Sequence, residues 1–251
     1  MGAHLTEERK TLIWKQFDSR RFGYYRQARR IARNGLQKSI EPVIELLEDK
    51  GVQVAFDNFD AFIDKEALRT AYNRIYIMVG VPFAQRSNEE LAGKMKQDED
   101  WTRRVMQYLG IAINDRLDAV TLTTKNKIAK VLSDGIRMGT SIQDMAARIA
   151  ADAGGAVRAT RIARTEVISA SNLGSIEGAR ATELQLNKTW LATRDTRTRE
   201  THDEADGQTV AMDELFNVNG SLLDFPGDWS NNADLAEIIQ CRCTTIYRVR
   251  R

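Results

Sequence analysis

The stretch 161–172, RIARTEVISASN, lies in a run from about residue 156 to 184 that contains no proline and is interrupted only by Gly174 and Gly178. Such a run predicts one long helix. Everything before it has helical periodicity, and the pattern changes to that of short strands after Leu186. This helix is therefore expected to join a helical region to a small β unit.

The polar side chains of this helix form a candidate structural seam. Arg164 and Glu166 are two residues apart, so they do not face each other on a helix. A buried Glu166 therefore needs partners from elsewhere in the chain. We interpret Thr165 and Glu166, with Ser169 and Asn172 further along, as a clamp that holds the helix to the β unit, in preference to a catalytic site.

The residues after the helix predict strands and tight turns. Lys188–Thr193 is typical of a strand, and a final strand is expected over Ile238–Val249, where Cys241, Cys243, Thr245, Tyr247 and Val249 alternate. Asp206-Gly207 and Asn219-Gly220 are turn signals. Phe225-Pro226-Gly227-Asp228 is expected to be a loop.

The residues before the helix predict further helices. Pro42 is placed at the start of a short helix that Gly51 ends, and 80–82 is predicted to be a break. Ser141 with Asp144 resembles a capping box. The expected helices are 5–37, 42–51, 60–78, 89–119, 123–134, with Thr123 or Thr124 as cap, and 141–151. The predicted fold is mainly α: a helical region 1–120, then a small α+β domain 121–251 with a few antiparallel strands.

Composition narrows the class of protein. Of 251 residues only three are proline and two are cysteine, which fits a helical chain and excludes a disulfide scaffold. The longest apolar run, Ile75–Ala84, is far short of the roughly 20 residues of a transmembrane helix. The first ten residues lack the apolar segment of a secretory signal, so none is expected.

Charge is distributed unevenly. Residues 1–40 hold ten Lys/Arg and three Asp/Glu, whereas residues 192–240 hold three Arg and eleven Asp/Glu. In the first helix an apolar face with several aromatic residues is flanked by arginines, namely Arg20, Arg21, Arg26, Arg29, Arg30 and Arg33. These arginines form either a solvated helix face or an arm that binds an acidic protein surface or packaged double-stranded DNA.

Two further clusters contain residue types that bind metals or act as general bases. His202 lies in an acidic run, 195–207, where it would be a metal ligand, a general base or part of a polar turn. Cys241 and Cys243 are too far apart on one strand face for a good disulfide. They either bind a soft metal, with His202 as the third ligand of a zinc site, or are small buried apolar residues. No other cofactor is predicted.

Known catalytic patterns are missing from the sequence. There is no Walker, Gly-x-Ser-x-Gly or His-Glu-x-x-His motif. We therefore predict no catalytic residues and do not expect an enzyme.

In order, these features resemble the phage head morphogenesis family, the Mu F-like minor head proteins. The resemblance covers about 124–250 and rests on the Ile-Ala-Arg-Thr-Glu helix, the Trp strand, the Asp-x-Arg…His…Asp-Gly run, the Pro-Gly loop and Cys-Arg-Cys. The matching residues include Arg164, Thr165, Glu166, Asn172, Trp190, Asp195, His202, Asp206 and Gly207. Arg199 and His202 replace a Cys-x-x-Cys that some members carry, and Gln240 replaces an Asn.

The resemblance implies a minor structural protein of a tailed-phage or prophage head, made in the bacterial cytoplasm and located inside the procapsid or virion. It implies binding to the portal or major capsid protein, and a role in head assembly or in genome packaging and delivery. No membrane partner is expected. The alternatives are a capsid-carried DNA-binding protein and a metal-dependent hydrolase or toxin-like enzyme built on His202.

Overall fold

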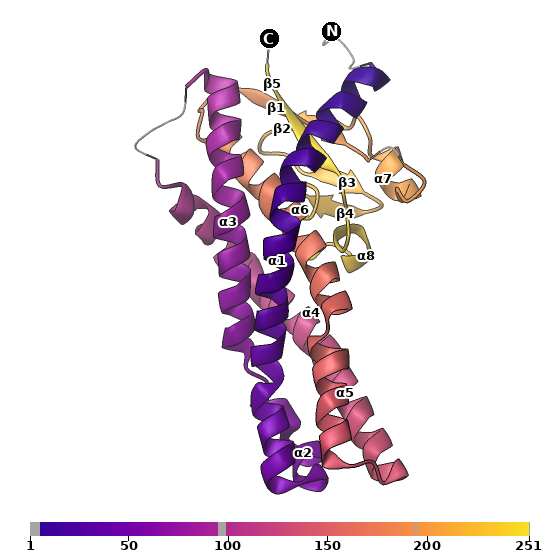
Figure 1. Cartoon of the computed structure of the whole chain (residues 1–251). Helices are drawn as coiled ribbons and strands as arrows, with labels where there is room; N and C mark the ends of the chain where they lie inside the picture. The colour runs from indigo at the N-terminus through magenta and orange to yellow at the C-terminus, as the bar shows by residue number, and fades with distance from the viewer. Residues whose placement is uncertain (1–5, 95–98, 194, 251) are drawn as a thin grey trace. The chain divides into compact units, whose positions relative to one another are not determined.

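A computed structural model describes residues 6–94, 99–193 and 195–250 (Figure 1). Most of the chain is helical. The helices are α1 (Glu7–Lys50), α2 (Val52–Asn58), the 3-10 helix η1 (Phe59–Phe62), α3 (Lys65–Ala92), α4 (Trp101–Met138), α5 (Ile142–Gly154), α6 (Ala156–Arg180), α7 (Glu200–Glu204) and α8 (Leu235–Ile238). The strands are β1 (Leu186–Leu191), β2 (Thr209–Ala211), β3 (Phe216–Val218), β4 (Ser221–Leu223) and β5 (Thr244–Val249). The predicted mainly helical class with a few antiparallel strands is confirmed.

The chain forms two compact units that interleave along the sequence. Unit 1 comprises residues 1–26, 75–111 and 164–251, and unit 2 comprises 27–74 and 112–163. The predicted division at 120/121 does not coincide with either unit, because that position lies inside the continuous helix α4. Four long helices, α1, α3, α4 and α6, contribute residues to both units.

Two prolines lie inside helices, although the sequence indicated helix boundaries there. Pro42 is within α1 and Pro82 is within α3. Proline removes one backbone hydrogen bond and crowds the preceding turn. Each helix nevertheless continues, because buried neighbours hold it against other elements: Val43 beside Pro42, and Phe83 beside Pro82.

Helix α4 also passes through a predicted helix start. Thr123 and Thr124 do not cap a helix but donate their hydroxyls to the carbonyls of Ala119 and Val120, one turn earlier. By contrast, the predicted cap of α5 is confirmed: Ser141 Oγ accepts from Asp144 N at 3.1 Å and donates to Asp144 Oδ2 at 2.8 Å. Gly51, with φ +81°, follows the last residue of α1 as predicted.

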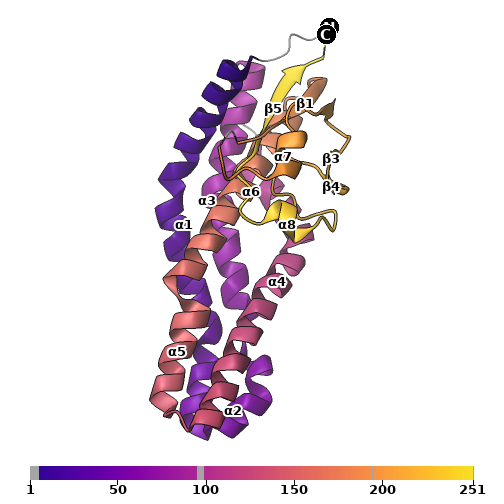
Figure 2. The same ribbon diagram turned by 90° about the vertical axis from the view of Figure 1, so that its right-hand side faces the viewer.

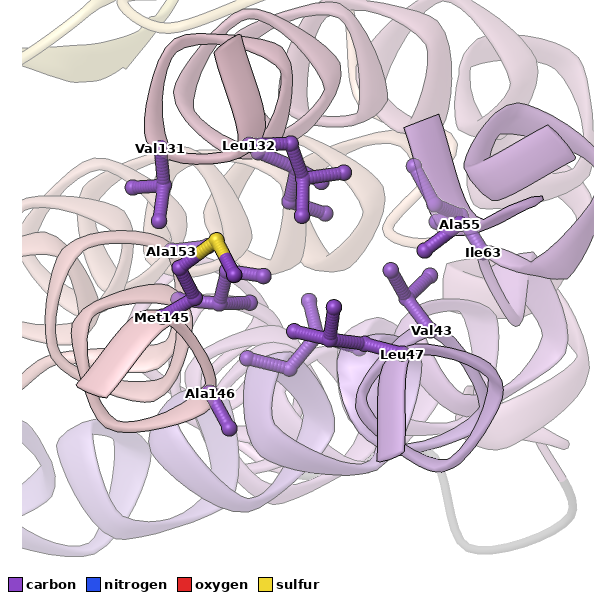
Figure 3. Close-up of a cluster of buried hydrophobic side chains, with 12 residues drawn as sticks. Val43, Leu47, Ala55, Ile63, Val131, Leu132, Met145, Ala146 and Ala153 are labelled. Carbon is purple, nitrogen blue, oxygen red and sulfur yellow. The ribbon is translucent and has the colours of Figure 1, made fainter. Parts of the chain in front are cut away.

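Unit 2 is built around one apolar cluster (Figure 3). Its side chains come from α1, α2, α4 and α5 and from Ile63, and the best buried include Val43, Leu47, Ile128, Leu132 and Ile149. Nearby, the Arg158 guanidinium donates to the carbonyls of Ala153 and Val120 and to Thr124 Oγ1, which satisfies a cation that is largely shielded from solvent.

Unit 1 contains both sheets. In the larger sheet β1 is central and pairs antiparallel with β2 and β5. β3 and β4 form a hairpin whose two-residue loop, Asn219-Gly220, has φ values of +51° and +82°. These values fit the type I′ turn that Asn-Gly favours. The strands and the short helices α7 and α8 cluster together (Figures 1 and 2).

Helices α3 and α6 approach closely within unit 1, and glycine makes this possible. A Cβ added to Gly174 would lie 2.1 Å from the carbonyl oxygen of Gly80, and one on Gly178 would lie 2.1 Å from that of Ala84. The close approach is reinforced by Ser87 Oγ, which donates to Ser175 O at 2.7 Å. The two glycines that interrupt the helical pattern of α6 therefore set its packing distance.

The final strand is shorter than predicted. β5 begins at Thr244, and residues 235–238 form α8. Gln240 has φ +58°, so the chain reverses locally before the two cysteines. Cys241 and Cys243 consequently precede the strand and do not share a strand face.

Candidate functional site

Asn172 of α6 is the centre of the buried polar seam in unit 1. Its Nδ2 donates to Pro226 O at 2.8 Å and to Cys243 O at 3.1 Å. Its Oδ1 accepts from Arg21 Nη2 at 2.7 Å and from Thr244 Oγ1 at 3.0 Å. The amide therefore uses all of its hydrogen-bonding capacity. This one side chain ties α6 to α1, to the Pro-Gly loop and to the start of β5.

The neighbouring seam residues extend this clamp along α6. Thr165 Oγ1 accepts from Gln240 N at 3.1 Å, and Ser169 Oγ donates to Gly227 O at 2.5 Å. Gly227 has φ +85°, and a Cβ there would lie 3.2 Å from Ser169 Cα, so the loop can approach the helix only with glycine. Glu166 is buried and its Oε2 lies 3.1 Å from the hydroxyl of Tyr76 on α3.

Arg164 and Arg21 differ from their expected roles. Arg164 is exposed on α6 and does not lie within the seam. Arg21 is fully buried, with its Nε donating to Ser171 Oγ at 2.7 Å in addition to its bond with Asn172. Burial lowers the pKa of its guanidinium. Arg21 is therefore a structural residue of unit 1 and is not available to bind a partner or DNA, which corrects the prediction.

The other arginines of α1 remain on the surface. Arg20 is partly exposed and pairs with Glu90 at 3.1 Å. Arg26, Arg29, Arg30 and Arg33 are all exposed. They recur every three or four residues and so share one side of the helix.

Two carboxylates, those of Asp195 and Asp206, hold the acidic run 195–207 in place. The Asp195 carboxylate pairs with both terminal nitrogens of Arg242, at 2.7 Å for Nη2, and accepts from Arg197 N at 2.9 Å. The contact with Arg242 has the largest effect, and together these contacts hold the pKa of Asp195 well below its usual range. The run is thereby fixed to the residue between the two cysteines.

Asp206 and Gly207 form the predicted turn. Asp206 Oδ1 accepts from Ala192 N at 2.9 Å, and Oδ2 accepts from Lys10 Nζ at 2.7 Å. Gly207 has φ +82° and donates its N–H to Trp190 O at 2.9 Å. Trp190 is completely buried, with its ring edge-on to those of His202 and Phe216. The motif thus packs His202 against an apolar wall.

The structure brings His202, Cys241 and Cys243 together, although they are about 40 residues apart in sequence. His202 Nδ1 lies 3.3 Å from Cys243 Sγ and 3.6 Å from Cys241 Sγ. All three side chains are buried, and their potential ligand atoms lie within 4.8 Å of one another. The three residues predicted as zinc ligands therefore lie together, although the two cysteines precede β5 and do not share a strand face.

Glu237 completes the surroundings of the imidazole. Its Oε2 lies 2.9 Å from His202 Nε2, and Glu237 is only 4% exposed. Thr201 Oγ1 donates to the same oxygen at 2.8 Å. The carboxylate faces one imidazole nitrogen while the two sulfurs face the other.

The two thiols are electrostatically unequal. Burial raises the pKa of the Cys241 thiol, but hydrogen bonds from Cys243 and the positive charges of Arg199 and Arg21 outweigh it, so the pKa lies below its ordinary value. Burial and the neighbouring Cys241 raise the pKa of Cys243 well above its ordinary value.

Several important residues carried no clear sequence signal. Asp228 of the Pro-Gly loop is fully buried and accepts from the Tyr108 hydroxyl at 2.5 Å and from Asp224 N at 2.8 Å. Lys188 is buried beside Asp224, whose carboxylate and carbonyl both accept from its Nζ. Glu237 also went unrecognised. Asp228 lay in a segment that the sequence marked as a loop, and Lys188 began one that it marked as a strand.

Within the described residues, no helix is long and apolar enough to cross a membrane.

Part of the chain is similar to a known protein family. Residues 126–246, just under half of the chain, match the family described as phage Mu protein F like protein. The chain is 33% identical over 127 residues to the minor head protein GP7 of Bacillus phage SPP1. The aligned segment covers 49% of this chain and 40% of that protein.

A second relative has a different name. The chain is 41% identical over 92 residues to the NAD(+)–arginine ADP-ribosyltransferase EFV of Enterococcus faecalis strain ATCC 700802 / V583, covering 36% of this chain and 18% of that protein. The chain thus spans less than half of the length of either curated relative. No solved structure gives a significant match.

Proposed function

Since residues 126–246 match the phage Mu protein F-like family, we propose that this chain is a minor head protein of a tailed phage or prophage, located in the procapsid or virion. The family match carries the proposal, and the likeness to a phage minor head protein supports it. The proposed role is to bind the portal or the inner capsid surface and to assist head assembly or genome packaging.

The exposed arginines of α1 are the proposed contact with that partner. Arg26, Arg29, Arg30 and Arg33 present four positive charges on one side of a single helix. Such a stripe attracts an acidic protein surface or DNA phosphates, and the attraction weakens as salt screens it. Arg21 takes no part because it is buried, and removing the whole arm would destroy the seam around Asn172.

The test is co-sedimentation of the full chain with portal rings and with empty procapsids of its own phage. We expect the wild-type chain to sediment with at least one particle. A variant with all four of these arginines changed to Gln is expected to lose that binding while keeping its helical circular dichroism.

The matched control removes the same charge elsewhere. It changes four other exposed basic residues to Gln, namely Arg103, Lys130, Arg137 and Arg148. We expect it to bind like wild type. Equal loss in both variants would show a non-specific charge effect, and wild-type binding to neither particle would contradict the head-protein proposal.

Binding to DNA distinguishes the alternative of a capsid-carried DNA-binding protein. Each phosphate contact contributes about −0.9 to the slope of log K against log salt for duplex DNA. If the stripe binds DNA, the four-Gln variant should lower the steepness of that slope by up to about 3.6. An unchanged slope with intact particle binding would favour a protein partner.

We propose that the chain acts without catalysis. His202, the one candidate base, is 2% exposed, and its two nitrogens face Glu237 and the two thiols, so a substrate has no access to it. The likeness to the transferase covers only 18% of that protein, so we do not extend its activity to this chain. We expect no transfer of ADP-ribose from NAD⁺ to arginine or protein; transfer by the purified chain would contradict this proposal.

A further inference from the structure

Two sulfurs and one imidazole nitrogen converge at a single buried point in unit 1. His202 Nδ1 lies 3.3 Å from Cys243 Sγ and 3.6 Å from Cys241 Sγ. A nitrogen with one lone pair can accept from only one thiol at good geometry. The presence of both sulfurs at similar range is therefore not explained by a single hydrogen bond.

The separations match those between ligands of a tetrahedral metal ion. With Zn–S near 2.3 Å and Zn–N near 2.0–2.1 Å, tetrahedral angles place sulfur and nitrogen about 3.5 Å apart and two sulfurs about 3.8 Å apart. The observed sulfur–nitrogen distances of 3.3 and 3.6 Å bracket the first value. The two sulfur–nitrogen separations therefore have the dimensions of a metal site, and all three potential ligand atoms lie within 4.8 Å of one another.

Glu237 orients the imidazole for this role. The Glu237 carboxylate lies 2.9 Å from Nε2 without hydrogen-bond geometry, and its negative charge favours a proton on that nitrogen. The lone pair then lies on Nδ1, the nitrogen that faces the sulfurs. Metal-binding histidines commonly have a carboxylate or carbonyl partner of this kind. Glu237 is itself fixed by Thr201 Oγ1, so the ring has one defined orientation.

Charge balance favours a divalent cation in this position. Two thiolates neutralise Zn²⁺, so the complex adds no net charge to a buried region that already holds the Arg21 guanidinium. Thiolate and imidazole ligands together suit zinc rather than magnesium or calcium, which take oxygen ligands.

We propose that Cys241, Cys243 and His202 bind one zinc ion, with Glu237 as the residue that positions His202. The ion joins α7 to the segment that leads into β5. Among residues 6–94, 99–193 and 195–250, no fourth His, Cys or carboxylate joins this cluster, so the described part of the chain supplies three ligands. The role is structural, because all three ligand side chains are buried.

The first test is the metal content of the full chain purified under reducing conditions, with and without added zinc. We expect one zinc per chain. Replacement by Co²⁺ should produce thiolate-to-cobalt charge-transfer absorption, which reports the sulfur ligands directly in the wild-type chain. A chain that binds neither ion, or that carries a Cys241–Cys243 disulfide in place of metal under these conditions, would overturn the proposal.

Variants separate ligand from positioning residue. Cys241→Ser with Cys243→Ser should abolish stoichiometric zinc and the cobalt absorption. Glu237→Gln should leave one zinc per chain but weaken it about 10- to 100-fold in a chelator competition. Zinc affinity unchanged in the double variant would overturn the site, and unchanged affinity in Glu237→Gln would overturn the positioning role.

Thr193→Val is the matched control. Thr193 is buried in the loop after β1, and its hydroxyl has no hydrogen-bond partner, so the change preserves volume and removes no ligand. We expect its zinc content and cobalt spectrum to equal those of wild type. Because the metal readouts on wild type and Glu237→Gln need no cysteine substitution, the proposal stays testable even if the double variant fails to fold.

Discussion

The two compact units differ in what fills their interiors. Among the described residues, unit 1 contains sixteen buried polar or charged side chains, whereas unit 2 contains four. Unit 2 is organised around the apolar cluster of Val43, Leu47 and Leu132, as a helical bundle is. Unit 1 is organised around hydrogen bonds that converge on Asn172.

This difference affects how each unit specifies its structure. Apolar packing is tolerant of changes in shape, provided that volume is conserved. A buried hydrogen-bond network is not, since each lost partner leaves another polar group unsatisfied. The network of unit 1 therefore fixes the positions of its loops, and all four tryptophans of the chain lie in unit 1, so their fluorescence reports on that unit.

The largest effect is expected from Asn172→Ala. The change removes one hydrogen bond each from Arg21, Thr244 and two carbonyls in a buried region. We expect a loss of about 3–5 kcal/mol in the free energy of unfolding, measured by urea titration with tryptophan fluorescence. Asn172→Leu, which restores volume, should recover little of it. Full recovery with Leu would show that packing, and not the network, stabilises unit 1.

A slightly smaller effect is expected from Leu47→Ala in unit 2. Removing this fully buried side chain should cost about 2–5 kcal/mol, whereas Leu47→Met should cost less than about 1.5 kcal/mol. Circular dichroism, which follows the helices of both units, is the appropriate measurement. If Leu47→Met lowers the free energy of unfolding as much as Leu47→Ala, unit 2 is no more tolerant of changes in side-chain shape than unit 1, and the contrast between the units is wrong.

The helix crossing in unit 1 predicts opposite signs for two glycine substitutions. Gly174→Ala should destabilise by about 1–3 kcal/mol, because its Cβ would lie 2.1 Å from Gly80 O. Gly110→Ala in α4 should stabilise by roughly 0.5–1 kcal/mol, since no atom lies within 4 Å of the added Cβ. Thermal melting of both variants tests this, and the same sign for both would refute the close approach of α3 and α6.

The smallest effect concerns the surface of unit 1. Arg242 lowers the pKa of Asp195, so this pair contributes stability above the unfolded-state pKa of about 3.9. That contribution is lost as pH falls below about 5 towards the folded-state pKa. Because the pair is partly exposed, we expect about 1 kcal/mol or less. Asp195→Asn should flatten the acid limb of stability against pH; an unchanged limb would mean that the pair contributes nothing.

Much of the fold follows from local sequence chemistry. The Ser141 cap, the stop at Gly51 and the turn at Asn219-Gly220 are fixed by residues only a few positions apart, and each is confirmed. The residues that the sequence marked for the clamp, such as Asn172, and for the metal ligands, such as His202, do come together.

What could not be predicted depends on contacts distant in sequence. Pro42 and Pro82 do not end their helices, because packing of neighbouring residues outweighs a local cost. Nothing local distinguishes Arg21 from the exposed arginines that follow it; its burial is decided by Ser171 and Asn172. Glu237 likewise gains its role only when α8 is brought to His202.

The hydrogen bond between Arg21 and Ser171 joins residues that are 150 positions apart in the chain, so Arg21 is synthesised well before its partner. At about 5–20 residues per second, the ribosome takes roughly 8–30 seconds to add the partner after the arginine has been made. During that interval the guanidinium of Arg21, which is buried in the folded chain, lacks its hydrogen-bond partners Ser171 and Asn172. Unit 1 therefore cannot mature stepwise from its amino-terminal end, and its assembly must await late segments of the chain.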